Sequence, residues 1–148
     1  TMVKDQTEVL RPQRPNTIAK SIAIGNPADG YYAAAECRTS GGGAEDVTDD
    51  ELLEGIQLLA STEGIWTETA GGVTVAVTKK LAEQGRFGRD DVVVIAITGN
   101  GLKTPEAVKD RLLTKGTIAP NLAAFDAAYE ERYRLPARPD APRELVTA

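Results

Sequence analysis

The residues with the clearest chemical potential form the short segment Thr98-Gly99-Asn100-Gly101-Leu102-Lys103. Its two glycines let the backbone pass close to a flat or anionic ligand, and the Thr98 hydroxyl can donate to or accept from a ring nitrogen. Taken alone, the same segment is also typical of a plain turn between a strand and a helix. The elements around it must therefore decide whether it is a binding turn.

Two other places carry residues that suit a binding site. The turn Ile24-Gly25-Asn26-Pro27 can hold its backbone against the face of a cofactor, but the same residues also terminate helices. Glu68 lies between an expected strand and an expected helix, where its carboxylate could orient a substrate or a substituent of a cofactor. A lone carboxylate in a loop is otherwise a solvated charge.

The composition excludes several kinds of chemistry. The 148 residues include no histidine and one cysteine, Cys37, so Ser-His-Asp and Cys-His catalytic sets, imidazole metal ligands and multi-cysteine zinc sites are ruled out. The net charge of −5 and the lack of a basic stripe argue against nucleic-acid binding. No apolar run approaches the roughly 18 residues of a membrane span, and no signal peptide opens the chain. We expect a cytoplasmic protein without a metal.

The element that must position Thr98 is the apolar run at residues 92–98, VVVIAIT. A run without polar alternation is what a central strand covered on both faces requires. Such a strand would place Thr98 at its carboxyl end, where open α/β sheets bind their ligands. Thr104 and Pro105 then follow as the N-cap and first residue of a helix that we expect to reach about Leu113.

Two longer helices are predicted before this strand. Thr48 and Glu51 form a capping box for a helix over residues 49–62, which Gly64 ends. A second helix is entered at Gly71-Gly72 and closed by Gly85. Its expected buried side carries Val73, Val77 and Leu81.

Shorter elements complete the expected alternation of strands and helices. They are a short helix over 17–24, a helix over 28–37, strands over 44–47 and 65–67, and a helix over 121–133. The alternation predicts layers of helices on a parallel sheet. We divide the chain into an extended lead-in at 1–16, an α/β domain at 17–135 and a polar, proline-rich tail at 136–148. The abrupt opening suggests a segment of a larger protein.

Residues 11–110 resemble the C-terminal part of the threonine synthases, pyridoxal-phosphate enzymes of the tryptophan-synthase-β-like fold. The resemblance lies in three segments in the same order, RPNTIAKSIAIGNPADGYYAA, SGGGAEDVTDDELLEGIQLLASTEGIWTETAGG and VVVIAITGNGLKTPEAV. It implies a three-layer α/β sandwich with a mostly parallel sheet, part of a fold-type-II enzyme.

The resemblance also implies roles for single residues. Thr98 matches the hydroxyl residue that hydrogen-bonds the pyridine nitrogen, and Gly99 and Asn100 match the turn beneath the ring. Glu68 matches the glutamate of the family's E-P-A segment, although Thr69 replaces the proline. The loop of Ile24, Gly25 and Asn26 matches the loop that flanks the cofactor.

The family's Schiff-base lysine stands in an S-F-K-D-like motif that does not occur in these residues. Lys20, Lys79, Lys80 and Lys103 match other positions of the family. We therefore assign no catalytic residue and expect no turnover by this chain alone, because a pyridoxal enzyme needs its covalent anchor and proton-transfer base.

The implied reaction converts O-phospho-L-homoserine and water to L-threonine and phosphate. The implied partners are a small amino-acid substrate and the N-terminal part of the enzyme or a complementing chain, and an incomplete sheet would favour a homo-oligomer. Two alternatives stay open: a non-catalytic binding or regulatory module of the same fold, and an independent nucleotide-binding domain. The absence of a G-x-G-x-x-G motif argues against the second.

Overall fold

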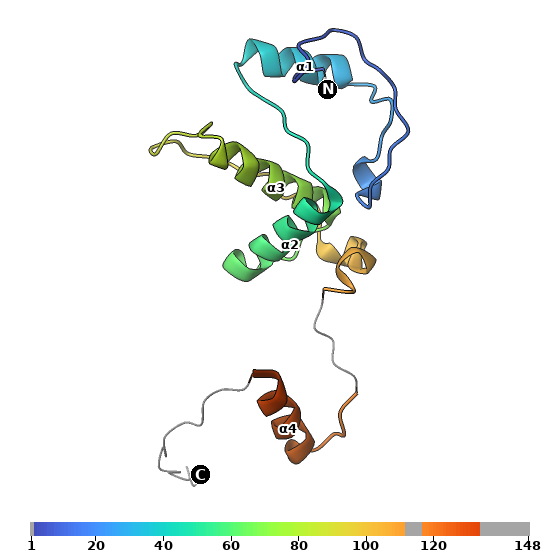
Figure 1. Cartoon of the computed structure of the whole chain (residues 1–148), viewed down its shortest axis with the longest axis vertical. Helices are drawn as coiled ribbons and strands as arrows, with labels where there is room; N and C mark the ends of the chain where they lie inside the picture. Colours follow the sequence, from blue (N-terminus) through green and yellow to red (C-terminus); the bar gives the residue numbers. More distant parts are fainter. Residues whose placement is uncertain (1, 112–116, 134–148) are drawn as a thin grey trace. The chain divides into compact units, whose positions relative to one another are not determined.

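The computed structural model describes residues 2–111 and 117–133. Its helices and 3-10 turns, in chain order, are η1 (Lys20–Ile22), α1 (Gly30–Thr39), α2 (Asp49–Glu63), α3 (Thr69–Glu83), η2 (Gly101–Lys103), η3 (Pro105–Val108) and α4 (Leu122–Tyr133) (Figure 1). The chain divides into two compact units, Thr1–Leu112 and Leu113–Ala148, and the first contains both candidate binding turns. The expected tail at 136–148 lies outside the described residues.

Helix α2 begins and ends where its sequence signals predict. The Thr48 hydroxyl accepts a hydrogen bond from the Glu51 amide at 3.2 Å, and the Glu51 carboxylate accepts one from the Thr48 amide at 2.6 Å. Gly64 then takes the left-handed conformation, with φ of 68°. The predicted capping box and glycine C-cap are confirmed.

Helices α2 and α3 pack closely enough to touch backbone to backbone. A Cβ added at Gly55 would overlap the Gly72 carbonyl oxygen, and one added at Gly72 would overlap the Leu52 carbonyl oxygen. Leu52 and Ile56, only 1% and 3% exposed, belong to the apolar core beside this contact. Glycines in the two helices therefore fix how near the helices come.

The buried side of α3 differs from the predicted one. Val73, Val77 and Leu81 are half-buried, because the close approach to α2 is made at Gly72 instead. The buried residues of α3 are Thr69, Gly71, Gly72, Val75 and Ala76. The glycine pair lies inside the helix, in its first turn, and is not the entry to it.

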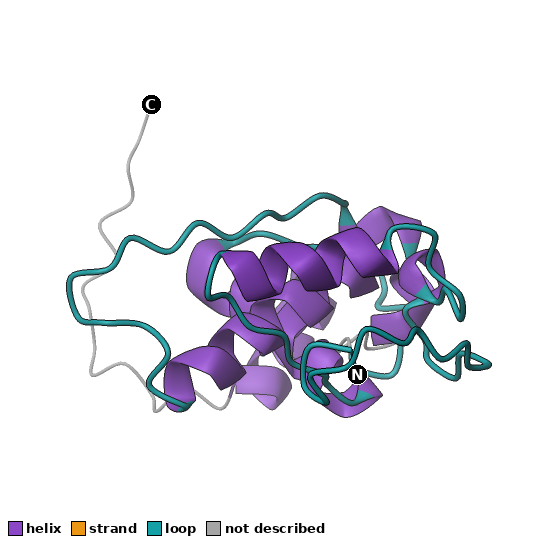
Figure 2. Ribbon diagram, turned by 90° about the horizontal axis from the view of Figure 1, so that it is seen from above, coloured by secondary structure: helices purple, strands orange, loops and turns teal. Residues whose placement is uncertain are grey.

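The predicted strand at 92–98 is wrong for the described residues, which contain no strand (Figure 2). Val92 and Val94 are 92% and 89% exposed. A strand needs backbone partners on a neighbouring strand, and this part of the chain offers one isolated antiparallel bridge, between Thr67 and Asn100. For the same reason the strands expected at 44–47 and 65–67 do not form, and residues 2–111 and 117–133 do not show the expected three-layer sandwich.

The remaining elements follow their predictions in part. α1 is shifted by two residues, and the short helix expected over 17–24 is reduced to η1. The helix expected from Pro105 is a single 3-10 turn, η3, and the end expected for it near Leu113 lies outside the described residues.

In the second unit, α4 confirms the predicted helix, and the Asn121 side chain accepts a hydrogen bond from the Ala124 amide at its start. No helix among residues 2–111 and 117–133 has the length and apolar character to cross a membrane.

Candidate functional site

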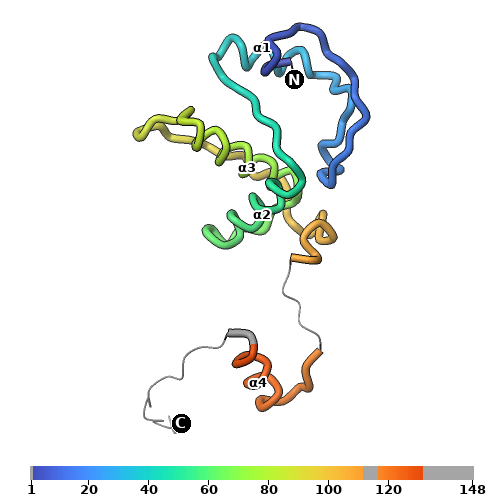
Figure 3. Tube along the Cα trace, viewed as in Figure 1, coloured from blue at the N-terminus to red at the C-terminus, as the bar shows by residue number. Residues whose placement is uncertain are grey.

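The segment at 98–103 is docked on the N-terminal end of α3. After α3 the chain runs back toward the start of the helix (Figure 3). There the Gly99 carbonyl accepts hydrogen bonds from the Glu68 amide at 3.1 Å and from the Thr67 hydroxyl at 2.9 Å. The Gly101 amide donates to the Trp66 carbonyl at 3.0 Å. We call residues 98–103 the docked turn.

The glycines of the docked turn are required by the protein's own packing. A Cβ at Gly99 would overlap the carboxyl group of Glu68, and a Cβ at Gly101 would overlap the indole ring of Trp66. The sequence suggested that these glycines make room for a ligand. The structure shows that they first make room for Glu68 and Trp66.

Glu68 is the buried acid of this site. It occupies the N-cap position of α3 without capping it through its side chain, which is 5% exposed. One carboxylate oxygen, Oε1, lies 3.0 Å from Lys103 Nζ. The other, Oε2, is buried without a hydrogen-bond partner, and so is the hydroxyl of neighbouring Thr69. Buried polar atoms are almost always hydrogen-bonded, so these two fit a polar ligand at the helix start.

Thr98 and Asn100 stand on either side of Gly99 and are both exposed. The Asn100 side chain accepts a hydrogen bond from the Leu102 amide at 2.9 Å and so caps η2. Within the described part of the chain, no hydrogen bond is made by the Thr98 hydroxyl. Four of the predicted site residues, Glu68, Thr98, Gly99 and Asn100, therefore come together.

The loop of Ile24, Gly25 and Asn26 lies in a different place. The Gly25 carbonyl accepts a hydrogen bond from the Gln13 amide at 2.9 Å, and a Cβ at Gly25 would overlap the Gln13 carbonyl oxygen. Ile24 and Gly25 line a hollow of about 700 Å³ formed with the N-terminal segment. Among the described residues, no hydrogen bond links this loop to the docked turn.

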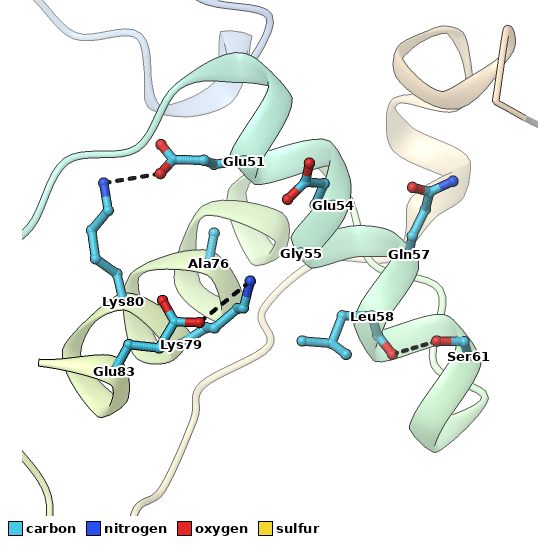
Figure 4. A pocket seen from close by; sticks show the side chains of 10 residues that line it. All are labelled: Glu51, Glu54, Gly55, Gln57, Leu58, Ser61, Ala76, Lys79, Lys80 and Glu83. Atoms are coloured by element: carbon cyan, nitrogen blue, oxygen red, sulfur yellow. Dashed lines mark hydrogen bonds and ion pairs between the residues drawn. The ribbon is translucent and has the colours of Figure 1, made fainter. Parts of the chain in front are cut away.

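A second hollow, of about 410 Å³, lies between α2 and α3, and four of its charged side chains form two ion pairs (Figure 4). Lys80 Nζ lies 3.1 Å from Glu51 Oε1, and Lys79 Nζ lies 3.6 Å from Glu83 Oε1. The Thr48 amide, and after it Lys80, hold the pKa of Glu51 below its usual range. The hollow contains no residue of the docked turn, and none of its lining residues has a buried polar atom without a hydrogen-bond partner.

Sequence reasoning missed Lys103 as a member of the site. The available signal was the sequence T-G-N-G-L-K itself, in which the lysine follows the glycine turn by two residues. What the sequence could not show is that Glu68, 35 positions earlier, lies within reach of its ammonium group.

Comparisons with known proteins show which family the chain belongs to. Residues 2–99 match the family described as pyridoxal-phosphate dependent enzymes. The chain is 43% identical to the threonine synthase of Methanocaldococcus jannaschii over 104 residues, 70% of this chain and 26% of that protein. It is 42% identical to the threonine synthase of Methanosarcina acetivorans over 127 residues, 85% of this chain and 31% of that protein.

The threonine synthase of Halalkalibacterium halodurans is 38% identical over 109 residues, 74% of this chain and 31% of that protein. The chain thus spans between a quarter and a third of the length of these relatives. The matched family has an α/β fold of type II and depends on pyridoxal phosphate. The unpaired buried oxygens of Glu68 and Thr69, which lie beside a glycine turn, fit such a polar group. The chain therefore belongs to the pyridoxal-phosphate-dependent enzymes.

Proposed function

We propose that this chain is the C-terminal portion of a threonine synthase and supplies one wall of its cofactor site. The observation that carries the proposal is the docked turn: Gly99 is hydrogen-bonded to the start of α3 beside a buried carboxylate with an unpaired oxygen. The similarity to three threonine synthases over most of this chain supports it. The complete enzyme would convert O-phospho-L-homoserine and water to L-threonine and phosphate.

The chain's own residues would bind and orient the cofactor. The Thr98 hydroxyl would hydrogen-bond the pyridine nitrogen, and Gly99 and Asn100 would lie beneath the ring. Glu68 would hold a polar substituent through Oε2. Ile24, Gly25 and Asn26 would flank the cofactor in the complete enzyme. Pyridoxal phosphate, when bound, supplies the electron sink that the elimination of phosphate needs.

The exposed run at 92–98 indicates what completes the protein. Its side chains suit a strand buried on both faces, yet Val92 and Val94 are almost fully exposed here. We propose that the run becomes a strand of the three-layer sandwich when it pairs with the N-terminal part of the enzyme or a complementing chain. We propose a homo-oligomeric, cytoplasmic enzyme, with 17–135 as the portion of its cofactor domain that this chain supplies.

We further propose that this chain does not turn over substrate alone, because the Schiff-base lysine motif is not among its residues. The test is the intact mass of the chain after mixing with pyridoxal phosphate and reduction with borohydride. The expected result is no stoichiometric adduct at any single lysine. A single mapped adduct would show that the chain has its own anchor and would overturn this part of the proposal.

A complementation assay tests the reaction itself. The chain is mixed with the part of the Methanocaldococcus jannaschii enzyme outside the matched region, and phosphate release from O-phospho-L-homoserine is measured. Release by the mixture and by neither part alone is the expected result. Tight association without release would favour a non-catalytic binding module.

A further inference from the structure

The ion pair between Lys103 and Glu68 joins an exposed side chain to a buried one. Lys103 is 60% exposed at its side chain, whereas that of Glu68 is 5% exposed, and Nζ lies 3.0 Å from Oε1. A buried carboxylate is costly unless it is paired, and a lost partner leaves an uncompensated charge. Lys103 provides that compensation from the solvent side, at one of the two oxygens.

The same lysine closes the docked turn at its far end. The near end is held by the backbone bonds of Gly99 and Gly101 to residues 66–68, and Lys103 is the last residue of η2. The Thr69 amide also donates to the Thr104 hydroxyl at 3.2 Å. The turn is thus fixed to the start of α3 on both sides of Asn100.

Two polar atoms at this junction still lack partners. Glu68 Oε2 and the Thr69 hydroxyl oxygen are both buried, and Thr69 is 0% exposed. Oε1 already accepts from Lys103 Nζ, whereas Oε2 is the carboxylate oxygen that has no hydrogen-bond partner and can accept one. A ligand group that carries a proton would satisfy it.

We propose that Lys103 is a positioning residue: it latches the docked turn onto α3 through Glu68 Oε1 and thereby aims Oε2 at a proton-bearing group of the ligand. The inference rests on the proposed function, which puts a pyridoxal-type ring on the docked turn. Lys103 does not touch the ring. It acts through Glu68.

The latch is tested first without ligand, by hydrogen exchange of the Glu68 and Gly101 amides in the 148-residue chain. Lys103→Met is expected to raise both exchange rates at least fivefold, and Lys103→Arg to restore them, because the arginine keeps the charge. Lys109→Met is the matched control, since Lys109 is exposed and its side chain makes no ion pair among the described residues. Unchanged exchange in Lys103→Met overturns the latch.

The orientation of Oε2 toward the ligand is tested with pyridoxamine 5′-phosphate. This probe has no aldehyde and forms no Schiff base with surface lysines. The wild-type amides of Glu68, Gly99 and Gly101 should shift on titration. Lys103→Met should weaken binding at least fivefold at a temperature well below its unfolding transition, where the variant is fully folded, and Lys103→Arg should restore it.

The outcomes separate the two proposals. Equal affinity of wild type and Lys103→Met, with the amides shifted in both, overturns the positioning role and leaves the proposed function standing. If the probe shifts none of these amides, the proposed place of the cofactor fails, and the ligand role of Oε2 fails with it. The exchange experiment then still decides whether Lys103 latches the turn.

Discussion

The contact between α2 and α3 and the run at 92–98 are both strongly apolar in sequence, yet only the first is buried. Leu52 in α2 is 1% exposed, while Val92 is 92% exposed. A helix satisfies its backbone hydrogen bonds within itself and needs a neighbour only for its side chains. A strand needs another strand for its backbone as well, and residues 2–111 and 117–133 supply none.

The α2–α3 pair and the run at 92–98 differ in how much each needs from the rest of a protein. The pair of helices is complete within this chain, and the docked turn is attached to it by backbone hydrogen bonds. The run at 92–98 leads from the segment after α3 into that turn and leaves the side chains of Val92 and Val94 in solvent. Substitutions in the helices should therefore change stability, and substitutions in the run should change association.

Truncation of a core side chain should give the largest effect. Leu52→Ala removes a fully buried side chain and leaves a cavity, so we expect a loss of about 3 kcal/mol in the free energy of unfolding. Val94→Ala, in the exposed run, should cost less than about 0.5 kcal/mol. Urea denaturation followed by circular dichroism measures both. Equal losses of unfolding free energy in the two variants would mean that Val94 is packed as tightly as Leu52, and would contradict the difference between the two regions.

A side chain at Gly99 should disrupt the attachment of the turn. Gly99→Ala places a methyl group against the Glu68 carboxylate, and overpacking of this kind is expected to cost about 2 kcal/mol. Gly88→Ala is the control, because a Cβ there makes only ordinary contact with Asp91. The same denaturation assay applies. A neutral Gly99→Ala would contradict the close packing of the turn on Glu68.

Loss of the capping box should have a smaller effect. Thr48→Ala removes the hydroxyl that accepts from the Glu51 amide, with an expected cost of about 1 kcal/mol. Thr62→Ala, near the other end of α2, should be close to neutral, since its hydroxyl only bonds back to the Leu58 carbonyl. If Thr62→Ala lowered the free energy of unfolding as much as Thr48→Ala, the capping box would not stabilise α2 more than an ordinary hydroxyl contact does.

Acid should weaken the charge network that ties the N-terminal segment to residues 45–46. The pKa of Asp46 is held below its usual range by Lys4, and that of Glu45 by the Gln84 amide and then by Lys4. A carboxyl group whose pKa is lowered by folding stabilises the fold at pH values above its pKa in the unfolded chain. That stabilisation is lost as the pH falls through the pKa in the folded chain. Unfolding temperature should thus fall slightly between about pH 5 and pH 3.

Lys4→Met is the matched variant for the acid effect. It removes the partner of both carboxylates, and its unfolding temperature should depend less on acid than that of the wild type. The pKa of Lys4 is raised by Asp46 and then by Glu45, so its own contribution is present at neutral pH and is lost only in strong alkali. Identical acid profiles of the two proteins would show that the network does not stabilise the fold.

The sequence alone determined the features that depend on neighbouring residues. The capping box of Thr48 and Glu51, the left-handed Gly64 and the helix that follows Asn121 were all predictable, because each rests on bonds within a few residues. The family was also predictable, since the ordered motifs and the glycine turn are read directly from the residues.

Only the tertiary structure decided which residues meet. It buried the face of α3 that carries Gly72, Val75 and Ala76 more deeply than the predicted one, because the backbones of α2 and α3 touch at Gly72. It left Val92 and Val94 exposed and 92–98 without strand structure, because a strand forms only with a partner strand. It also brought Lys103 to Glu68, a contact between distant residues that depends on the path of the chain around α3 and not on any local pattern.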